Sequence, residues 1–514
     1  KRASLPRPSL SHSSWPLYLR GPKAQMRIMP CRSFLQFYGQ TYRLTCWSAL
    51  LVCCLFLAFM SGCKKRISIA ERDYTNQPKV TAKDIRSNLV VFDYALYTAD
   101  LATRDQAEQA LLSLLEKEPY SRFAVTEDIT RRTTAPSIQI QALDASSDQF
   151  AVPNPEILKY FGIGLLEEEI SQVAAAKGLL LVSFAWPNSD DYKLLLTATA
   201  LMGQITQVDS ASGDPVSWLW DAETRQMFSP AAWHEQRILT WQNATIPDAS
   251  ANVTIHAYRI NDLIRIITLG MAKFGLPDLA FESLPASSQS DAAYILNATA
   301  QAMVEGQLIG DNSCLTLNLQ TLKHAEATQR YQEIIRENGT GLATLTFRKA
   351  RKDKGDPTNL VFEITGEAYA DEADDVARLQ RIFTNCFGRH YEIIESDHDQ
   401  QDLIAASNEA RKQIPALQAR FQEGLHEGEM ILVKAPFVEG NKKEYMWLEV
   451  INWEEDSITG VLLNQPSSLA SVGEGQKVQI KQQEVFDYLH IHPDGTSSGN
   501  TTSKILQSRL ESGR

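Results

Sequence analysis

The chain has 514 residues, of which 44% are apolar and 22% charged, and its net charge is −12. This composition is that of an ordinary globular protein, which argues against a largely disordered chain and against a protein with many membrane spans. Residues 1–62 hold eight Lys or Arg and no Asp or Glu, so removing these eight positive charges from −12 leaves −20 for the rest. A body this acidic lacks the gathered positive charge that phosphate backbones require, which argues against a nucleic-acid partner.

The first predicted element is an export signal, residues 1–62. Its uncharged run of 17 residues, 46–62, follows three arginines and ends in small residues, which is the order of a secretion signal. Met26 and Met29 would each begin a signal of ordinary length. We therefore interpret residues 1–25 as lying upstream of the true start of translation. A run of this length is at the lower limit for a spanning helix, and an uncleaved transmembrane anchor is the alternative.

The end of this signal, Met60-Ser61-Gly62-Cys63, resembles the lipobox of bacterial lipoproteins, although Met60 stands where Leu is usual. The resemblance implies that the Cys63 thiol receives a diacylglycerol and that cleavage leaves Cys63 as the new amino terminus. Each buried methylene adds about 0.8 kcal/mol, so two or three acyl chains hold a protein firmly on a bilayer. We therefore expect residues 63–85 to be a tether and the body to face the periplasm or the exterior.

The body from residue 86 alternates strand-like and helix-like segments. Runs rich in β-branched and aromatic residues predict strands, and apolar residues at helical spacing predict helices. The predicted strands are 88–97, 137–143, 178–186, 215–221, 252–259, 263–270, 314–319, 342–349 and 359–365. The predicted helices are 105–117, 155–177, 191–203, 287–305, 323–337 and 372–386. The alternation predicts an α/β (α+β) fold with two sandwich-like units, residues 86–306 and 307–398.

The sequence changes character in residues 399–503. A long amphipathic helix is predicted at 399–424, and short strands separated by tight turns follow from residue 429. Closely spaced antiparallel strands of this length predict a small β-barrel after the helix. Residues 504–514 are predicted to form a C-terminal tail.

Several short segments of this last region occur together in a recognisable order. They are Lys434-Ala435-Pro436-Phe437, Glu444-Tyr445-Met446-Trp447-Leu448-Glu449-Val450, Gly460-Val461-Leu462 with Asn464 and Pro466, then Gly475, Val478 and Phe486-Asp487-Tyr488. In this order and spacing the region resembles the YegJ-like family, a domain of unknown function. The resemblance implies no activity. We interpret these residues as ones that the fold of the domain requires. The alternative is that Trp447, Glu449 and Asn464 line a groove for a peptide or glycan.

Two cysteines, Cys314 and Cys386, lie in the body, outside the signal and the lipobox. In an oxidising periplasm two such thiols can pair, which would close a loop of about 70 residues and add ~4 kcal/mol. The alternative is two buried free thiols, because Cys is among the most buried residue types.

The sequence offers no convincing catalytic motif. His490-Ile491-His492 would place two imidazoles on one face of a strand, but a third ligand at recognisable spacing is missing, so no metal site is predicted. The nucleophile-elbow, zinc-protease and phosphate-loop patterns are all absent from the sequence. We therefore predict no cofactor.

These observations favour a membrane-anchored lipoprotein of the bacterial envelope that binds a protein or peptide partner and is not an enzyme. A hydrolase of envelope polymers is one alternative, and it would need two carboxylates of the α/β half facing each other at roughly 5–10 Å. An immunity-like protein is another, in which the acidic body faces a basic toxin in the periplasm.

Overall fold

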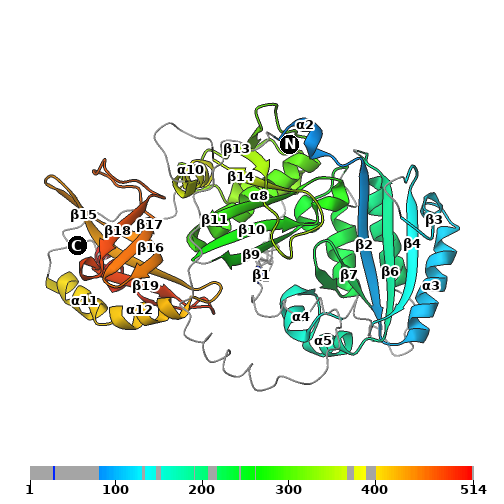
Figure 1. The fold of residues 1–514 in the computed structure, drawn as a ribbon, viewed down its shortest axis with the longest axis horizontal. Helices are drawn as coiled ribbons and strands as arrows, with labels where there is room; N and C mark the ends of the chain where they lie inside the picture. The colour runs from blue at the N-terminus through cyan, green and yellow to red at the C-terminus, as the bar shows by residue number, and fades with distance from the viewer. Residues whose placement is uncertain are drawn as a thin grey trace, which may run out of the picture.

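The computed structural model describes residues 27–28 and 80–511, apart from 130–132, 146–151, 190, 207–216, 242–244, 261, 367–374 and 389–400. The predicted lipid-attachment residue, Cys63, lies outside these ranges, as does nearly all of the predicted signal and tether. No helix in the described ranges has the length and apolar character needed to span a bilayer. The described chain forms three β-sheets with their helices, side by side (Figure 1).

The first sheet, on the right in Figure 1, has the strand order β3-β4-β6-β2-β7-β8-β5. Its strands are β2 (Leu89–Thr98), β3 (Ala124–Val125), β4 (Ser137–Asp144), β5 (Gly162–Ile163), β6 (Gly178–Pro187), β7 (Ser217–Asp221) and β8 (Gln226–Phe228). β6 lies between β2 and β4, and eight of its ten residues are buried, which explains its almost unbroken apolar sequence.

Helices cover both faces of this sheet. They are α3 (Leu101–Leu115), η2 (Tyr120–Arg122), α4 (Pro155–Phe161), α5 (Glu167–Ala174), α6 (Lys193–Ile205), α7 (Pro230–Trp233), η3 (His234–Ile238) and η4 (Leu239–Trp241). The short helix α2 (Ala82–Ile85) lies instead against the second sheet, where Asp84 pairs with Lys349. α3 and α6 pack in the apolar cluster that contains Phe92 and Phe184, while α4 and α5 pack in a second cluster with Tyr97 and Trp218. The single helix predicted at 155–177 is wrong, because β5 and the left-handed Gly164 (φ +69°) separate α4 from α5.

The second sheet has the order β1-β9-β10-β11-β14-β13-β12. Its strands are β1 (Arg27–Ile28), β9 (Thr254–Ile260), β10 (Leu263–Leu269), β11 (Asp278–Leu284), β12 (Cys314–Asn318), β13 (Leu342–Lys349) and β14 (Val361–Thr365). Its helices are η5 (Ala249–Ala251), η6 (Met271–Phe274), η7 (Ala286–Ser288), α8 (Gln289–Val304), α9 (Ala325–Glu333) and α10 (Asp375–Phe387). The predicted boundary after residue 306 divides this sheet and is wrong, because β11 pairs in parallel with β14.

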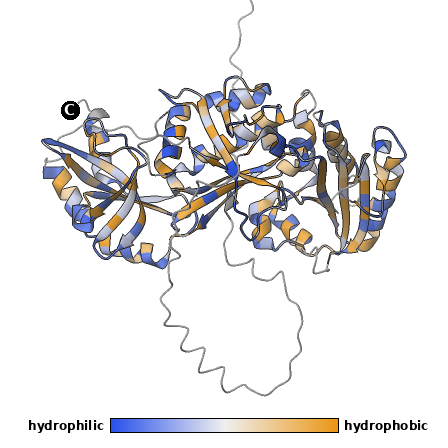
Figure 2. Ribbon diagram, turned by 45° about the horizontal axis from the view of Figure 1, so that its top comes forward, coloured by the Kyte–Doolittle hydropathy of each residue, from blue (hydrophilic) through white to orange (hydrophobic). Residues whose placement is uncertain are grey.

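The first two sheets share one hydrophobic core. A single cluster of buried side chains includes Phe184 and Trp233 from the first sheet and its helices, and Leu279 and Leu345 from the second sheet. Hydrophobic residues run along the strands, while the helices alternate hydrophobic and hydrophilic residues (Figure 2). The first two sheets are therefore one packed unit, here called the α/β half (residues 80–388).

The third sheet, on the left in Figure 1, has the order β18-β17-β16-β15-β19-β20. Its elements are α11 (Gln401–Arg411), α12 (Ile414–Glu423), β15 (Met430–Glu439), β16 (Lys442–Glu454), β17 (Ser457–Leu462), β18 (Lys477–Lys481), η8 (Gln482–Glu484), β19 (Asp487–Ile491), β20 (Ser497–Gly499) and α13 (Thr501–Glu511). We call residues 401–511 the C-terminal region.

Three sequence predictions for this region are corrected. The predicted barrel is wrong because β18 and β20 are both edges of an open sheet, whose apolar faces are covered by helices rather than by its own closure. The helix predicted at 399–424 divides into α11 and α12, with a proline in the first turn of α12. The predicted tail belongs to α13 as far as Glu511. The overall class, mixed helices and sheets of the α+β type, is confirmed.

Candidate functional site

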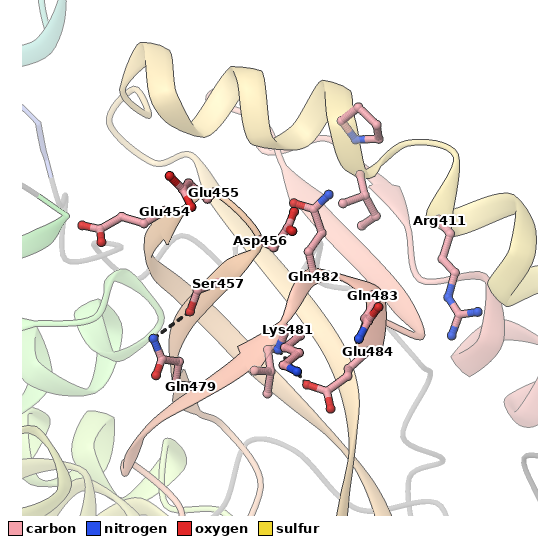
Figure 3. Close-up of a pocket in the computed structure, with 13 residues that line it drawn as sticks. Arg411, Glu454, Glu455, Asp456, Ser457, Gln479, Lys481, Gln482, Gln483 and Glu484 are labelled. Atoms are coloured by element: carbon pink, nitrogen blue, oxygen red, sulfur yellow. Dashed lines mark hydrogen bonds between the residues drawn. The ribbon is translucent and has the colours of Figure 1, made fainter.

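A groove of about 830 Å³ lies on the C-terminal region, beside β18 (Figure 3). The end of α11, the start of α12, the β16–β17 turn and the segment from β18 to η8 line it. Six of its lining residues are charged, namely Arg411, Glu454, Glu455, Asp456, Lys481 and Glu484. Four acidic and two basic side chains give this lining a net charge of −2, which favours a cationic ligand.

Hydrogen bonds fix the acidic β16–β17 turn from two sides. The Gln482 backbone N–H donates to the Asp456 carbonyl at 2.7 Å, and Gln418 Nε2 donates to the Glu455 carbonyl at 2.6 Å. Glu455 has φ +47°, the left-handed conformation that a tight turn requires. Within the part of the chain that the structure describes, the Glu455 and Asp456 carboxylates make no hydrogen bond or ion pair. A rigid backbone thus presents two carboxylates that are available to a ligand.

The three residues predicted to line a groove have other roles. Asn464 is buried, and its Oδ1 accepts a hydrogen bond from the Trp447 backbone N–H at 2.8 Å. Lys434 Nζ lies 5.8 Å from the centroid of the Trp447 ring. Glu449 is 2% exposed and its carboxylate accepts hydrogen bonds from residues of the α/β half. Asn464 and Glu449 therefore make structural contacts, and the groove found in the structure lies elsewhere on the same sheet.

Comparison with known proteins places this region in a family. The family model described as "Uncharacterized protein conserved in bacteria (DUF2314)" matches residues 400–513. The chain is also 25% identical, over 116 residues, to the uncharacterized protein YegJ of Escherichia coli (strain K12). That match covers 22% of this chain and 73% of the relative. The C-terminal region is YegJ-like. No solved structure matches the chain.

The YegJ-like region meets the α/β half through polar contacts. The Glu449 carboxylate accepts hydrogen bonds from the backbone N–H groups of Ala286 (2.7 Å) and Ser287 (2.9 Å), at the start of η7. Arg259 Nη2 of β9 donates to the Glu429 carbonyl at 2.9 Å. A carboxylate at a helix start satisfies backbone donors that have no partner within the helix. The family segment containing Glu449 therefore serves to dock the YegJ-like region.

The two histidines of the predicted strand pair are adjacent but do not form a metal site. Their ring centroids are 4.1 Å apart, and His490 Nε2 lies 2.8 Å from Glu429 Oε1. Burial raises the pKa of Glu429, but hydrogen bonds from Arg420, the His426 backbone N–H and His490 outweigh it and hold this pKa at about 2. Among the described residues no group of three or more metal-ligating side chains could hold a metal ion. Glu429 thus forms an ion pair with Arg420 and a hydrogen bond with His490.

Cys314 and Cys386 are both free thiols in the structure, so the possible disulfide is not formed there, and of the two only Cys386 is fully buried. Cys314 lies on the edge strand β12, and its Sγ is 3.5 Å from Thr346 Oγ1. Cys386 is buried in α10, and this burial raises the pKa of its thiol to about 12. A thiol with that pKa stays protonated at neutral pH and is a poor nucleophile.

The α/β half holds a buried ion cluster that the sequence did not reveal. Asp221 Oδ2 pairs with Arg237 Nη2 at 3.0 Å and with Lys273 Nζ, and all three side chains are at most 2% exposed. The Asp221 Oδ1 atom accepts hydrogen bonds from the backbone N–H groups of Glu223 and Thr224. Burial lowers the pKa of Lys273 to about 8, although Asp221 acts in the opposite direction.

Two further carboxyl groups next to this cluster have raised pKa values. Burial, followed by the negative charges of Asp221 and Asp278, raises the pKa of Glu223 to about 8. Burial raises the pKa of Asp278 to about 6. Perturbed pKa values often mark catalytic sites, but Asp221, Lys273 and Asp278 are 0% exposed. The cluster therefore connects β7 to η6 inside the unit and offers a substrate no access to these atoms.

Proposed function

We propose that this protein is a membrane-anchored lipoprotein of the bacterial envelope whose YegJ-like region binds a basic segment of a partner protein. The observation that carries the proposal is the groove beside β18, with its net charge of −2 and its two carboxylates, Glu455 and Asp456, that have no partner among the described residues. Complementary charge raises the rate of encounter and selects the partner. An immunity-like role toward a basic toxin is the narrower form of this proposal.

The proposal prefers binding to hydrolysis because of where the acidic side chains lie. In the described α/β half, Asp221 and Asp278 are fully enclosed and hydrogen-bonded, whereas a glycosidase needs two carboxylates that flank a bound sugar. Exposed carboxylates of the α/β half, such as Glu118 and Glu156, form surface ion pairs, whereas those of Glu455 and Asp456 in the groove have no partner among the described residues. An accessible acidic surface without a buried reactive pair suits recognition of a cation.

The membrane anchor is supported by the segment Met60-Ser61-Gly62-Cys63 and is tested by fractionation and intact-mass analysis. We expect the wild type in the membrane fraction, with acyl mass on a chain that begins at Cys63. Cys63→Ala should lose the acyl mass and the cleavage, while the matched control Cys54→Ala, inside the signal, should keep both. An unacylated, soluble wild-type protein would overturn the anchor.

The binding role is tested with the full chain in detergent and an acetylated, amidated heptapeptide of alternating lysine and valine. We expect the double variant Glu455→Gln/Asp456→Asn to bind this peptide about three- to tenfold more weakly and with less dependence on salt, because each exposed ion pair contributes about 0.2–1 kcal/mol. Glu409→Gln is the matched control, since Glu409 is an exposed acid of α11 outside the groove. Equal affinity in all three proteins, or no binding by the wild type, would overturn the role.

A further inference from the structure

The groove lies along a free edge of the β-sheet. β18 pairs with β17 alone and ends the strand order, so no strand among the described residues covers its other side. Lys477, Gln479 and Lys481 of β18 are exposed, whereas Ile480 is buried. Two of the exposed residues, Gln479 and Lys481, also line the groove. An open edge of this kind presents backbone N–H and C=O groups that an extended chain can bind.

The register of the β17–β18 pair identifies which backbone groups face outward. The Gln482 N–H donates to the Asp456 carbonyl, and the Leu462 N–H donates to the Gln476 carbonyl. Since hydrogen-bonded pairs in an antiparallel ladder recur at every second residue, the even-numbered residues of β18 face β17 and the odd-numbered ones face outward. The Lys481 N–H confirms this direction, because it donates to the Glu484 carboxylate at 2.6 Å, away from β17.

Gln479 is therefore the centre of the open edge. Its N–H and C=O both point away from β17, while the Lys481 N–H is already occupied by Glu484. An incoming strand can form two hydrogen bonds with Gln479, one as donor and one as acceptor. The acidic β16–β17 turn lies at the Lys481 end of this edge, since Ser457 pairs with Lys481.

We infer that a basic, extended segment of the partner protein adds to the sheet as a strand along β18. This inference rests on the proposed function and names how its groove is filled. Main-chain hydrogen bonds to Gln479 supply affinity, and alternate side chains supply specificity. Ile480 belongs to the same apolar cluster as Ile414 of α12, so the groove lies on that face of β18.

The alternation of side chains specifies the partner further. A segment with a basic residue at every second position directs these residues toward the acid-lined groove and places the others on the opposite face, beside Lys477. A slip by one residue would bring its basic side chains against Lys477, which disfavours that register. The partner segment is thus expected to alternate basic residues with uncharged ones.

The test compares two variants of the full chain at one position, measured with the lysine–valine heptapeptide. Gln479→Ala removes the side chain and keeps the N–H, so it measures the share of the side chain, and its affinity should fall less than that of Gln479→Pro. Gln479→Pro removes the outward N–H and should weaken binding about tenfold, because a main-chain hydrogen bond is lost and the ring hinders close pairing. Proline is tolerated on an edge strand whose N–H faces solvent, and a melting curve verifies folding.

A second measurement uses the wild-type protein, so it stands even if Gln479→Pro fails to fold. Two forms of the heptapeptide carry N-methyl groups on alternate amides, one form on the lysine amides and the other on the valine amides. A strand added to β18 directs only one of these sets toward the sheet. We expect one form to bind like the parent peptide and the other at least tenfold more weakly.

The outcomes separate this inference from the function on which it rests. Suppose both methylated peptides and both Gln479 variants bind like their parents, while Glu455→Gln/Asp456→Asn weakens binding. The inference is then wrong, and the groove binds a basic segment without strand addition. If the wild type does not bind the parent peptide at all, both the inference and the proposed binding role are overturned.

Discussion

The contacts between the first and second sheets differ in kind from the contacts between the second sheet and the YegJ-like region. Between the first and second sheets, apolar side chains such as Trp233 and Leu279 share one core, and Asp221 and Lys273 pair inside it. The YegJ-like region has a core of its own, which includes Leu448. It meets the second sheet through polar contacts, among them the Glu449 carboxylate at the start of η7, and through the side chain of Met430, which packs against the shared core.

The first two sheets are therefore held together as one unit, whereas the YegJ-like region is docked onto this unit. Removing the first sheet from the second would expose a shared core and an unpaired buried charge, so these two sheets should unfold together. The YegJ-like region can leave its contacts without opening its core, as interfaces between domains of one chain commonly allow. We therefore expect two unfolding transitions, one for the α/β half and one for the YegJ-like region.

The largest effect is expected for Asp221→Asn. The substitution leaves the positive charges of Arg237 and Lys273 buried without their counter-ion, so the free energy of unfolding of the α/β half should fall by about 3–5 kcal/mol. Thermal or denaturant unfolding measures this change. Asp191→Asn is the matched control, since Asp191 and Lys193 form an exposed ion pair that contributes about 1 kcal/mol or less. Equal effects of the two substitutions would contradict a structural role for the cluster.

A core substitution in the YegJ-like region should act on the other transition. Leu448 is fully buried, and Leu448→Ala should lower the free energy of unfolding of this region by about 2–5 kcal/mol. The α/β half should keep its midpoint, which calorimetry with two resolved transitions can measure. Leu166→Ala, at a leucine that is 70% exposed, is the control. A shift of both transitions together would show that the two parts form one cooperative unit.

The sequence predicted the central strand β6 well and missed β11, a buried strand whose apolar pattern is interrupted by acidic residues. The apolar run of β6 was predicted almost to its ends, because both of its faces are buried. β11 was missed since Asp278 and Glu282 interrupt its apolar pattern, and their partners, Thr268 and Arg265, come from the neighbouring strand. The sequence alone does not show such pairing. With β11 missing, the second sheet was divided after residue 306.

The candidate site was predicted least well, for a physical reason. The family segments contain residues with structural roles. Glu449 docks the YegJ-like region on η7, and Asn464 accepts a hydrogen bond from the Trp447 backbone N–H. Glu455 and Asp456, by contrast, lie in a turn that sequence reasoning treats as a simple connection. Only the register of β17 and β18 brings this turn beside an open edge.

Glu449→Gln tests the docking contact directly. The amide keeps one acceptor oxygen but loses the charge, so the interaction with the Ala286 and Ser287 N–H groups should weaken by about 1–3 kcal/mol. Amide hydrogen exchange at these two positions should become faster, while the two unfolding transitions stay nearly unchanged. Glu444→Gln is the matched control: Glu444, also on β16, binds backbone N–H groups of its own region, Ser467 among them. Unchanged exchange in Glu449→Gln would contradict the assigned docking role.

The smallest effect is expected from pH, through Glu427. Glu427 lines a small cavity between the two parts together with Arg259 and Ile264, and burial raises its pKa from 4.5 to about 7, although Arg259 acts in the opposite direction. The docked form therefore holds a proton that the separated form releases, so docking should weaken as pH rises from about 4.5 to about 7.

Because Glu427 remains partly exposed, solvent screening keeps this change below that of Glu449→Gln. Hydrogen exchange at the Ala286 and Ser287 amides, corrected for the intrinsic dependence on pH, measures docking across this range. Glu427→Gln, which cannot release a proton, should remove the pH dependence, while the exposed control Glu409→Gln should keep it. If the pH dependence persists in Glu427→Gln, another group between the two parts titrates, and Glu427 does not link docking to protonation.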